Sequence, residues 1–136
     1  MTVYEDKVKV FHQAMECAID EPLSTNTLEL RYKLLNEELT ELKTEMDTLC
    51  QELHTTGITQ PETKARMLKE LTDLQYVLSG TAVSFNLPLE EAFSRVHESN
   101  MSKLVNGKSL KREDGKILKG PNYHPPYLLD LAEKIK

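Results

Sequence analysis

Apolar side chains recur at helical spacing along most of the chain, and breaks in this pattern divide it into segments. The longest segment is predicted to be a helix over residues 27–54, in which an apolar residue recurs in alternating steps of four and three. The members of this stripe are Leu35, Leu39, Leu42, Met46, Leu49 and Leu53. Such a narrow stripe is typical of a helix that packs lengthwise against another helix.

A first helix is predicted before this one, over about residues 2–19. The turn that follows it is rich in residues that cap helix N-termini. These candidate caps are Ser24, Thr25, Asn26 and Thr27.

A third helix is predicted over residues 61–85. Gly57 ends the helix before it, Thr59 and Glu62 match a capping box, and Pro61 suits a first helical turn. The second half of this segment is apolar or small nearly all round. We therefore expect it to be buried on more than one side, in the centre of a bundle or at a subunit contact.

A fourth helix is predicted to open at Pro88 and to continue to Leu104. The polar stretch after it contains Gly and Pro, which indicates loops with room for a short hairpin, and "YLLDLAEKIK" predicts a last short helix. The expected fold is thus all-α: an antiparallel bundle of four main helices with an irregular C-terminal tail, assembled as an oligomer. We expect one domain over 1–136, with a core over about 1–104 and a tail over 105–136.

The composition argues against two classes of function, binding of a nucleic-acid polymer and spanning of a membrane. The chain has 136 residues, 39% of them hydrophobic, and a formal net charge of -5. An acidic protein lacks the basic surface that binding a nucleic-acid polymer requires. The chain shows no signal-peptide core and no apolar run near the ~18 residues of a membrane span, so the cytoplasm (a host's, if a phage encodes the protein) is the expected location. Cys17 and Cys50 fall among apolar positions and are predicted to be buried free thiols.

Two pairs of acidic residues are candidates for chemistry. Glu38 and Glu41 are three residues apart, as are Glu70 and Asp73, and residues three apart share one face of a helix. If their helices pack antiparallel, four carboxylates converge. Carboxylates this close repel one another unless a cation lies between them, and an all-oxygen site suits Mg²⁺ or Mn²⁺. The alternative is a solvated acidic face, although the run 37–52 carries only a single lysine among its acidic residues.

A second clue is the stretch "HESNMSKL" at residues 97–104. Asn100 and Lys103 stand near the end of the predicted fourth helix, where they can meet phosphate oxygens. The alternative is that both face solvent at a helix C-terminus, which also favours cations.

In this order, the motifs resemble those of the MazG-like family of all-α nucleoside triphosphate pyrophosphohydrolases. The family signature is Glu-x-x-Glu, a spacer, Glu-x-x-Asp and a later Asn and Lys, which fall here on Glu38, Glu41, Glu70, Asp73, Asn100 and Lys103. The opening "VKVFHQAM" and the tail "DGKILKGPNYHPP" also look like those of small phage and bacterial members.

The resemblance implies hydrolysis of a nucleoside triphosphate, often a deoxynucleotide, to the monophosphate and pyrophosphate by water attack at the α-phosphate. It implies that the four carboxylates hold Mg²⁺, with Mn²⁺ possible, and that Glu38 or Glu41, in particular Glu41, orients or deprotonates the water. Asn100 and Lys103 would touch sugar or phosphate. The assembly it implies is a homodimer or homotetramer.

Base recognition is less well defined. Phe11, His12 and Tyr76 can stack on or hydrogen-bond a base, and a packing role is open for each. Two other functions remain as alternatives: a non-catalytic helical interaction module that uses the leucine stripe, and a phosphoribosyl-ATP pyrophosphohydrolase.

Overall fold

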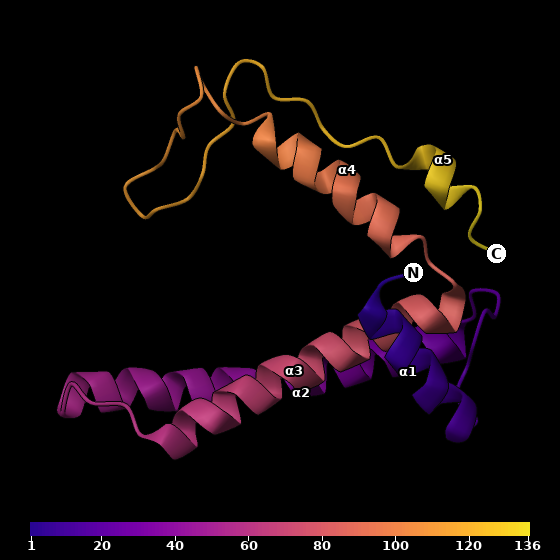
Figure 1. Ribbon diagram of the computed structural model, residues 1–136, viewed down its shortest axis with the longest axis horizontal. Helices are drawn as coiled ribbons and strands as arrows, with labels where there is room; N and C mark the ends of the chain where they lie inside the picture. Colours follow the sequence, from indigo (N-terminus) through magenta and orange to yellow (C-terminus); the bar gives the residue numbers. More distant parts are fainter. The chain divides into compact units, whose positions relative to one another are not determined.

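The computed structural model describes residues 1–136 and contains five α-helices and no regular strand (Figure 1). The all-α prediction is therefore confirmed. The chain forms two compact units: Thr2–Leu87 with Lys136, and Pro88–Ile135 with Met1. None of the helices is long and apolar enough to cross a membrane.

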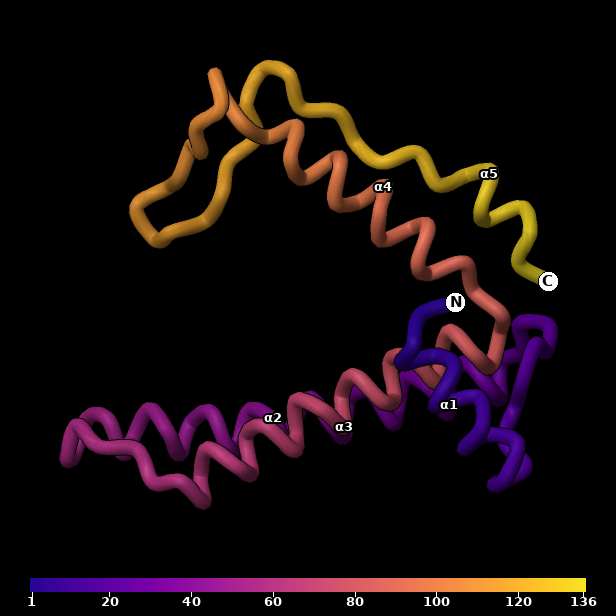
Figure 2. The backbone as a smooth tube through the Cα atoms, in the orientation of Figure 1, coloured from indigo at the N-terminus to yellow at the C-terminus, as the bar shows by residue number.

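The first unit consists of α1 (Val3–Ala14), α2 (Thr25–Thr55) and α3 (Pro61–Phe85). The chain doubles back between α2 and α3, which lie side by side along their length, and α1 packs on α3 (Figure 2). The second and third helices thus match their predicted limits to within two residues. Ser24 caps α2 by accepting a hydrogen bond from the backbone N–H of Thr27, and Gly57, with φ of 71°, follows its end.

Two predictions about helix ends in this unit were wrong. The first helix ends at Ala14 rather than near residue 19, because the chain enters the left-handed region at Glu16 and again at Asp20. The predicted capping box at the start of α3 is absent, since the N-cap is Gln60 and its side chain makes no capping hydrogen bond. Instead, the carboxylate of Glu52 on α2 accepts from the Gln60 backbone N–H at 3.1 Å.

The core of this unit lies where α3 is covered on several sides. Its last turns are buried, as the small and apolar residues predicted; the buried residues there are Ser79, Gly80, Ala82, Val83, Ser84 and Phe85. The leucine stripe of α2 is only partly covered: Leu42 is buried, whereas Leu39 and Leu53 are 54% and 55% exposed. Cys17 and Cys50 are free thiols, but both are exposed, so their predicted burial was wrong.

The second unit holds α4 (Leu89–Met101) and the short α5 (Leu129–Ala132). Arg95 on α4 binds both carboxylate oxygens of Asp130, at 2.6 and 3.0 Å, and the Ser99 hydroxyl donates to the His124 carbonyl at 2.7 Å. These contacts fix the end of the tail along α4. The tail between α4 and α5 contains two isolated antiparallel bridges but no continuous hairpin. The fourth helix ends at Met101, short of the predicted Leu104.

Candidate metal centre

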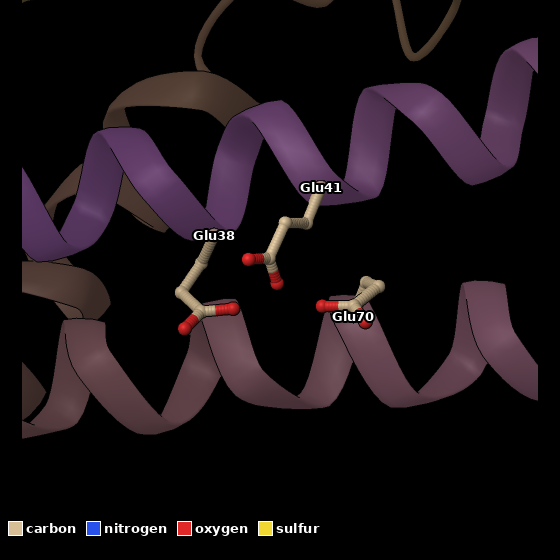
Figure 3. A group of neighbouring side chains, drawn as sticks. All are labelled: Glu38, Glu41 and Glu70. Atoms are coloured by element: carbon tan, nitrogen blue, oxygen red, sulfur yellow. The ribbon is translucent and has the colours of Figure 1, made fainter.

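Three carboxylates meet between α2 and α3. Glu38 and Glu41 reach down from α2 and Glu70 reaches across from α3 (Figure 3). One carboxylate oxygen from each lies within 4.8 Å of the others. The spacing explains the arrangement, because residues three apart on α2 share a flank and the antiparallel packing sets Glu70 opposite that flank.

Two of these carboxylates have an oxygen that is buried and has no partner. Oε2 of Glu38 and Oε2 of Glu70 are shielded from water and accept no hydrogen bond. A buried acceptor without a partner is costly, and more so when it carries charge. The chain therefore leaves in this place an acceptor set that only a proton or a cation from outside can satisfy.

Electrostatics agree with the geometry. The pKa of the Glu70 carboxyl is raised, first by burial and then by the neighbouring Glu41 carboxyl, and Lys69 only partly offsets this. The pKa of the Glu38 carboxyl is also raised, first by burial and then by the negative charges of Asp73 and Glu70. Both groups hold a proton more tightly than a solvated glutamate does.

Asp73, the fourth predicted carboxylate, is not one of the three. Its Oδ2 accepts from the Lys69 ammonium at 2.6 Å, and the same ammonium lies 3.5 Å from Glu70 Oε1. Asp73 is nevertheless near enough for its charge to raise the pKa of Glu38. Lys69 is thus a cation at the edge of the cluster that sequence reasoning passed over, although its place beside Glu70 was visible.

The residues present suit a hard divalent cation. The donors are carboxylate oxygens only, with no His or Cys, which is the set that Mg²⁺ and Mn²⁺ prefer. The unpartnered oxygens of Glu38 and Glu70 are the atoms that such an ion would bind.

The predicted base-contacting residues lie elsewhere in this unit. Tyr76 is 39% exposed, meets Phe11 edge-on with ring centroids 5.5 Å apart, and lines a pocket of about 330 Å³ between α1 and α3. At 100° per residue it lies some 240° around α3 from Glu70, so this pocket opens on another face of the helix. His12 is 3% exposed, and its Nδ1 donates to the Ala18 carbonyl at 2.8 Å.

Asn100 and Lys103 belong to the second unit. Asn100 is exposed in the last turn of α4, and its carbonyl accepts from the backbone N–H of Lys103 at 3.1 Å. Neither side chain makes a hydrogen bond or an ion pair. Both side chains thus remain candidates for contact with a ligand.

Sequence reasoning also missed the burial of an arginine on α2. Arg31 on α2 is 7% exposed, and its signal in the sequence is its position seven residues before Glu38, on the same face of the helix.

Comparison with protein families matches residues 8–100 to the phosphoribosyl-ATP pyrophosphohydrolase family. The match takes in well over half of the chain, from the middle of α1 to the last turn of α4. No curated protein matches the chain. The family is a MazG-like all-α pyrophosphohydrolase family, so the resemblance seen in the acidic motifs is confirmed. The chain therefore belongs to the phosphoribosyl-ATP pyrophosphohydrolase family and is a hydrolase that acts on phosphoric anhydrides.

Proposed function

We propose that the protein is a metal-dependent nucleoside triphosphate pyrophosphohydrolase, which releases pyrophosphate and the monophosphate from a nucleoside or deoxynucleoside triphosphate. The observation that carries the proposal is the cluster of Glu38, Glu41 and Glu70, in which two buried oxygens have no partner within the chain. Family membership supplies the reaction class. The proposed ion is Mg²⁺, with Mn²⁺ as the alternative.

In this proposal, Glu38, Glu41 and Glu70 hold the ion, and Asp73 joins them when Lys69 releases it. A divalent ion bound there supplies positive charge that offsets the charge of the phosphate oxygens. Asp73 lies close enough to act electrostatically on Glu38, which supports this fourth position.

Glu41 is the proposed base. It is the most exposed of the three glutamates, so its carboxylate can meet a water molecule at the edge of the cluster. Glu41 accepts a proton as the water oxygen bonds to the α-phosphorus, and the bond from that phosphorus to the pyrophosphate oxygen breaks. Glu38, one turn earlier on α2, is the alternative proton acceptor.

The two units are proposed to act as one domain. The family match runs across both, since it continues beyond Leu87 to Asn100. Asn100 and Lys103 are proposed to contact the sugar or a phosphate of the substrate, because their polar ends have no partner within the chain. Lys103 lies just beyond the matched residues.

A homodimer or homotetramer is proposed from the open leucine face. We give this name to six apolar residues that follow one side of α2 and α3, each at least 43% exposed: Leu39, Met46, Leu53, Leu68, Leu71 and Leu78. At 100° per residue, the two parts of the row fall on the same side of the antiparallel pair, away from Glu41 and Asp73. Exposed apolar surface of this kind is typical of a protein interface.

The family description favours phosphoribosyl-ATP as a second candidate substrate. A pyrophosphate-release screen over the common ribo- and deoxyribonucleoside triphosphates and phosphoribosyl-ATP, with and without Mg²⁺, tests the proposal. We expect Mg²⁺-dependent release from at least one triphosphate. If phosphoribosyl-ATP alone is cleaved, the second candidate replaces the first. If nothing is cleaved, the proposed reaction is wrong and the helical interaction module becomes the better account.

A further inference from the structure

A second charged group between the helices has no counterion. Arg31 on α2 is 7% exposed and has no carboxylate within ion-pair distance. Its Nε donates to the Thr81 hydroxyl at 3.3 Å and its Nη2 to the Val77 carbonyl at 2.8 Å. These are neutral acceptors, and Nη1 makes no hydrogen bond. Burial of a guanidinium without an anion is costly, so the residue is a poor choice for packing alone.

His12 faces the same place from α1. Its Nδ1 must carry the hydrogen, because its partner, the Ala18 carbonyl, can only accept. Nε2 is left without a hydrogen bond.

Gly80 makes room for both groups. A Cβ added at Gly80 would stand 3.0 Å from His12 Nε2 and only 2.3 Å from Arg31 Nη2. The absence of a side chain on α3 therefore lets the guanidinium and the imidazole meet at one point. Glycine inside a helix is otherwise unfavourable, by about 1 kcal/mol relative to alanine.

The position of Arg31 along α2 relates this place to the carboxylates. Arg31 precedes Glu38 by seven residues, which is two turns on the same face and about 10 Å along the axis. Val77 follows Glu70 by the same seven residues on α3. One helix pair thus presents carboxylates that lack a cation and, two turns away, a cation that lacks an anion. A nucleotide that carries a metal ion and several phosphates has both complements.

We propose that Arg31 and His12 form a phosphate subsite, which binds a phosphate group of the substrate other than the one attacked. Arg31 supplies the guanidinium donors, and His12 Nε2 donates to the same group when the ring is protonated. The proposal rests on the proposed function, but it concerns binding and not the reaction. The phosphate group bound is either the terminal one of a triphosphate or a separate phosphate ester on the nucleotide.

Anion binding without a metal gives the first test. Thermal unfolding is measured in chelator with inorganic phosphate or pyrophosphate, against chloride at the same ionic strength. We expect both oxyanions to raise the Tm of the natural protein and to have no such effect on Arg31→Met. Lys33→Met, which removes an exposed cation from the same helix, is the matched control and keeps the effect. An equal rise in Arg31→Met, or none in the natural protein, overturns the subsite.

A thiol reporter avoids altering the arginine. Cys17 lies beside this place, because its backbone N–H donates to the His12 carbonyl at 2.9 Å, and Cys17 is exposed. In a Cys50→Ser variant, Cys17 is the single thiol, and phosphate at Arg31 should slow its alkylation severalfold relative to chloride. The matching Cys17→Ser variant reports Cys50, whose rate should not change. Equal rates for Cys17 in phosphate and chloride contradict the proposal.

Kinetics separate the two sources of the phosphate group. With Arg31→Lys, which keeps the charge and loses the planar fork, we expect KM to rise roughly tenfold while kcat changes little. A rise for nucleoside triphosphates assigns the terminal phosphate, and a rise for phosphoribosyl-ATP alone assigns the separate ester. If KM is unchanged for every substrate that the natural protein cleaves, the subsite is wrong even though the proposed function stands.

Discussion

The interface between α2 and α3 treats its acidic residues in two different ways. At the end near Gly57, Glu52 accepts from the Thr63 hydroxyl at 2.6 Å and from the Gln60 backbone, and Glu45 pairs with Arg66 at 3.1 Å. One to four turns further along the same helix pair, Glu38, Glu41 and Glu70 face mainly one another. The same helices and the same residue type thus give two kinds of site. Glu45 and Glu52 form a closed set, in which each carboxylate has a donor, whereas Glu38, Glu41 and Glu70 form an open set, in which two oxygens have none.

The difference shows that the open cluster is not a consequence of packing two acidic helices. Where a carboxylate only holds the helices together, α3 provides a donor for it. At Glu70, α3 instead adds another carboxylate and a Lys69 ammonium that is shared with Asp73. Close like charges cost stability, so the cluster is better explained by a ligand than by the fold.

The largest expected difference between the two groups of glutamates is in the rate of catalysis. Glu70→Gln and Glu38→Gln keep the shape of the side chain but remove its charge, so we expect the rate of pyrophosphate release to fall by about 10²-fold or more. Glu45→Gln, on the same flank of α2 but paired with Arg66, is the matched control and should stay within about threefold of the natural protein. Comparable losses in all three variants would remove the distinction between the open and closed sets.

Removing the charge of Glu70 and removing that of Glu52 should change the thermal stability of the protein in opposite directions. In chelator, Glu70→Gln removes a charge held against its neighbours and should raise Tm by about 2–5 °C, whereas Glu52→Gln loses charged hydrogen bonds and should lower Tm by a similar amount. Differential scanning calorimetry of the two variants measures both. A lowered Tm for Glu70→Gln would mean that its carboxylate stabilises the fold, as that of Glu52 does.

The dependence of stability on pH should also differ between the cluster carboxylates and Glu52, although this effect is smaller. The pKa values of Glu38 and Glu70 are raised above 4.5 in the folded protein, so the folded state binds more protons than the unfolded chain there. Stability without metal should therefore fall as pH rises from about 4.5 through the raised values. The pKa of Glu52 is lowered, first by its bond from Thr63, so its contribution is full above about 4.5 and is lost as pH falls through the lowered value.

Thermal unfolding of Glu38→Gln/Glu70→Gln and of the natural protein, from about pH 4 to about pH 7, tests this. The advantage of the double variant should be smallest at the acid end and should grow towards neutrality. A constant difference across the range would show that the two carboxyls titrate normally.

Much of the three-helix unit could be predicted from the sequence, since its signals are local. Alternating steps of four and three set the stripe of α2, and Gly57 and Pro61 set the ends of the loop, so both helices fall within two residues of their predicted limits. The end of α1 could not be found in this way. It depends on two non-glycine residues with positive φ, Glu16 and Asp20, which the pattern of apolar residues does not reveal.

The candidate site was predictable to the same degree. Spacing on one helix places Glu38 and Glu41 together, and antiparallel packing adds Glu70. The lysine that binds Asp73 depends on side-chain conformations that spacing does not fix. Arg31 has only a weak signal in the sequence. Its position on the helix indicates burial, but only the structure shows that no carboxylate pairs with it.

The most direct test of the central claim is a titration of Mg²⁺ into the natural protein and into Glu70→Gln, with Glu45→Gln as the control. The measured quantity is the rise in Tm at each Mg²⁺ concentration. The account predicts a saturable rise for the natural protein and for Glu45→Gln. It predicts that the rise is absent or shifted to at least roughly tenfold higher Mg²⁺ for Glu70→Gln. The same curve for all three proteins would contradict the assignment of the carboxylate cluster as a metal centre.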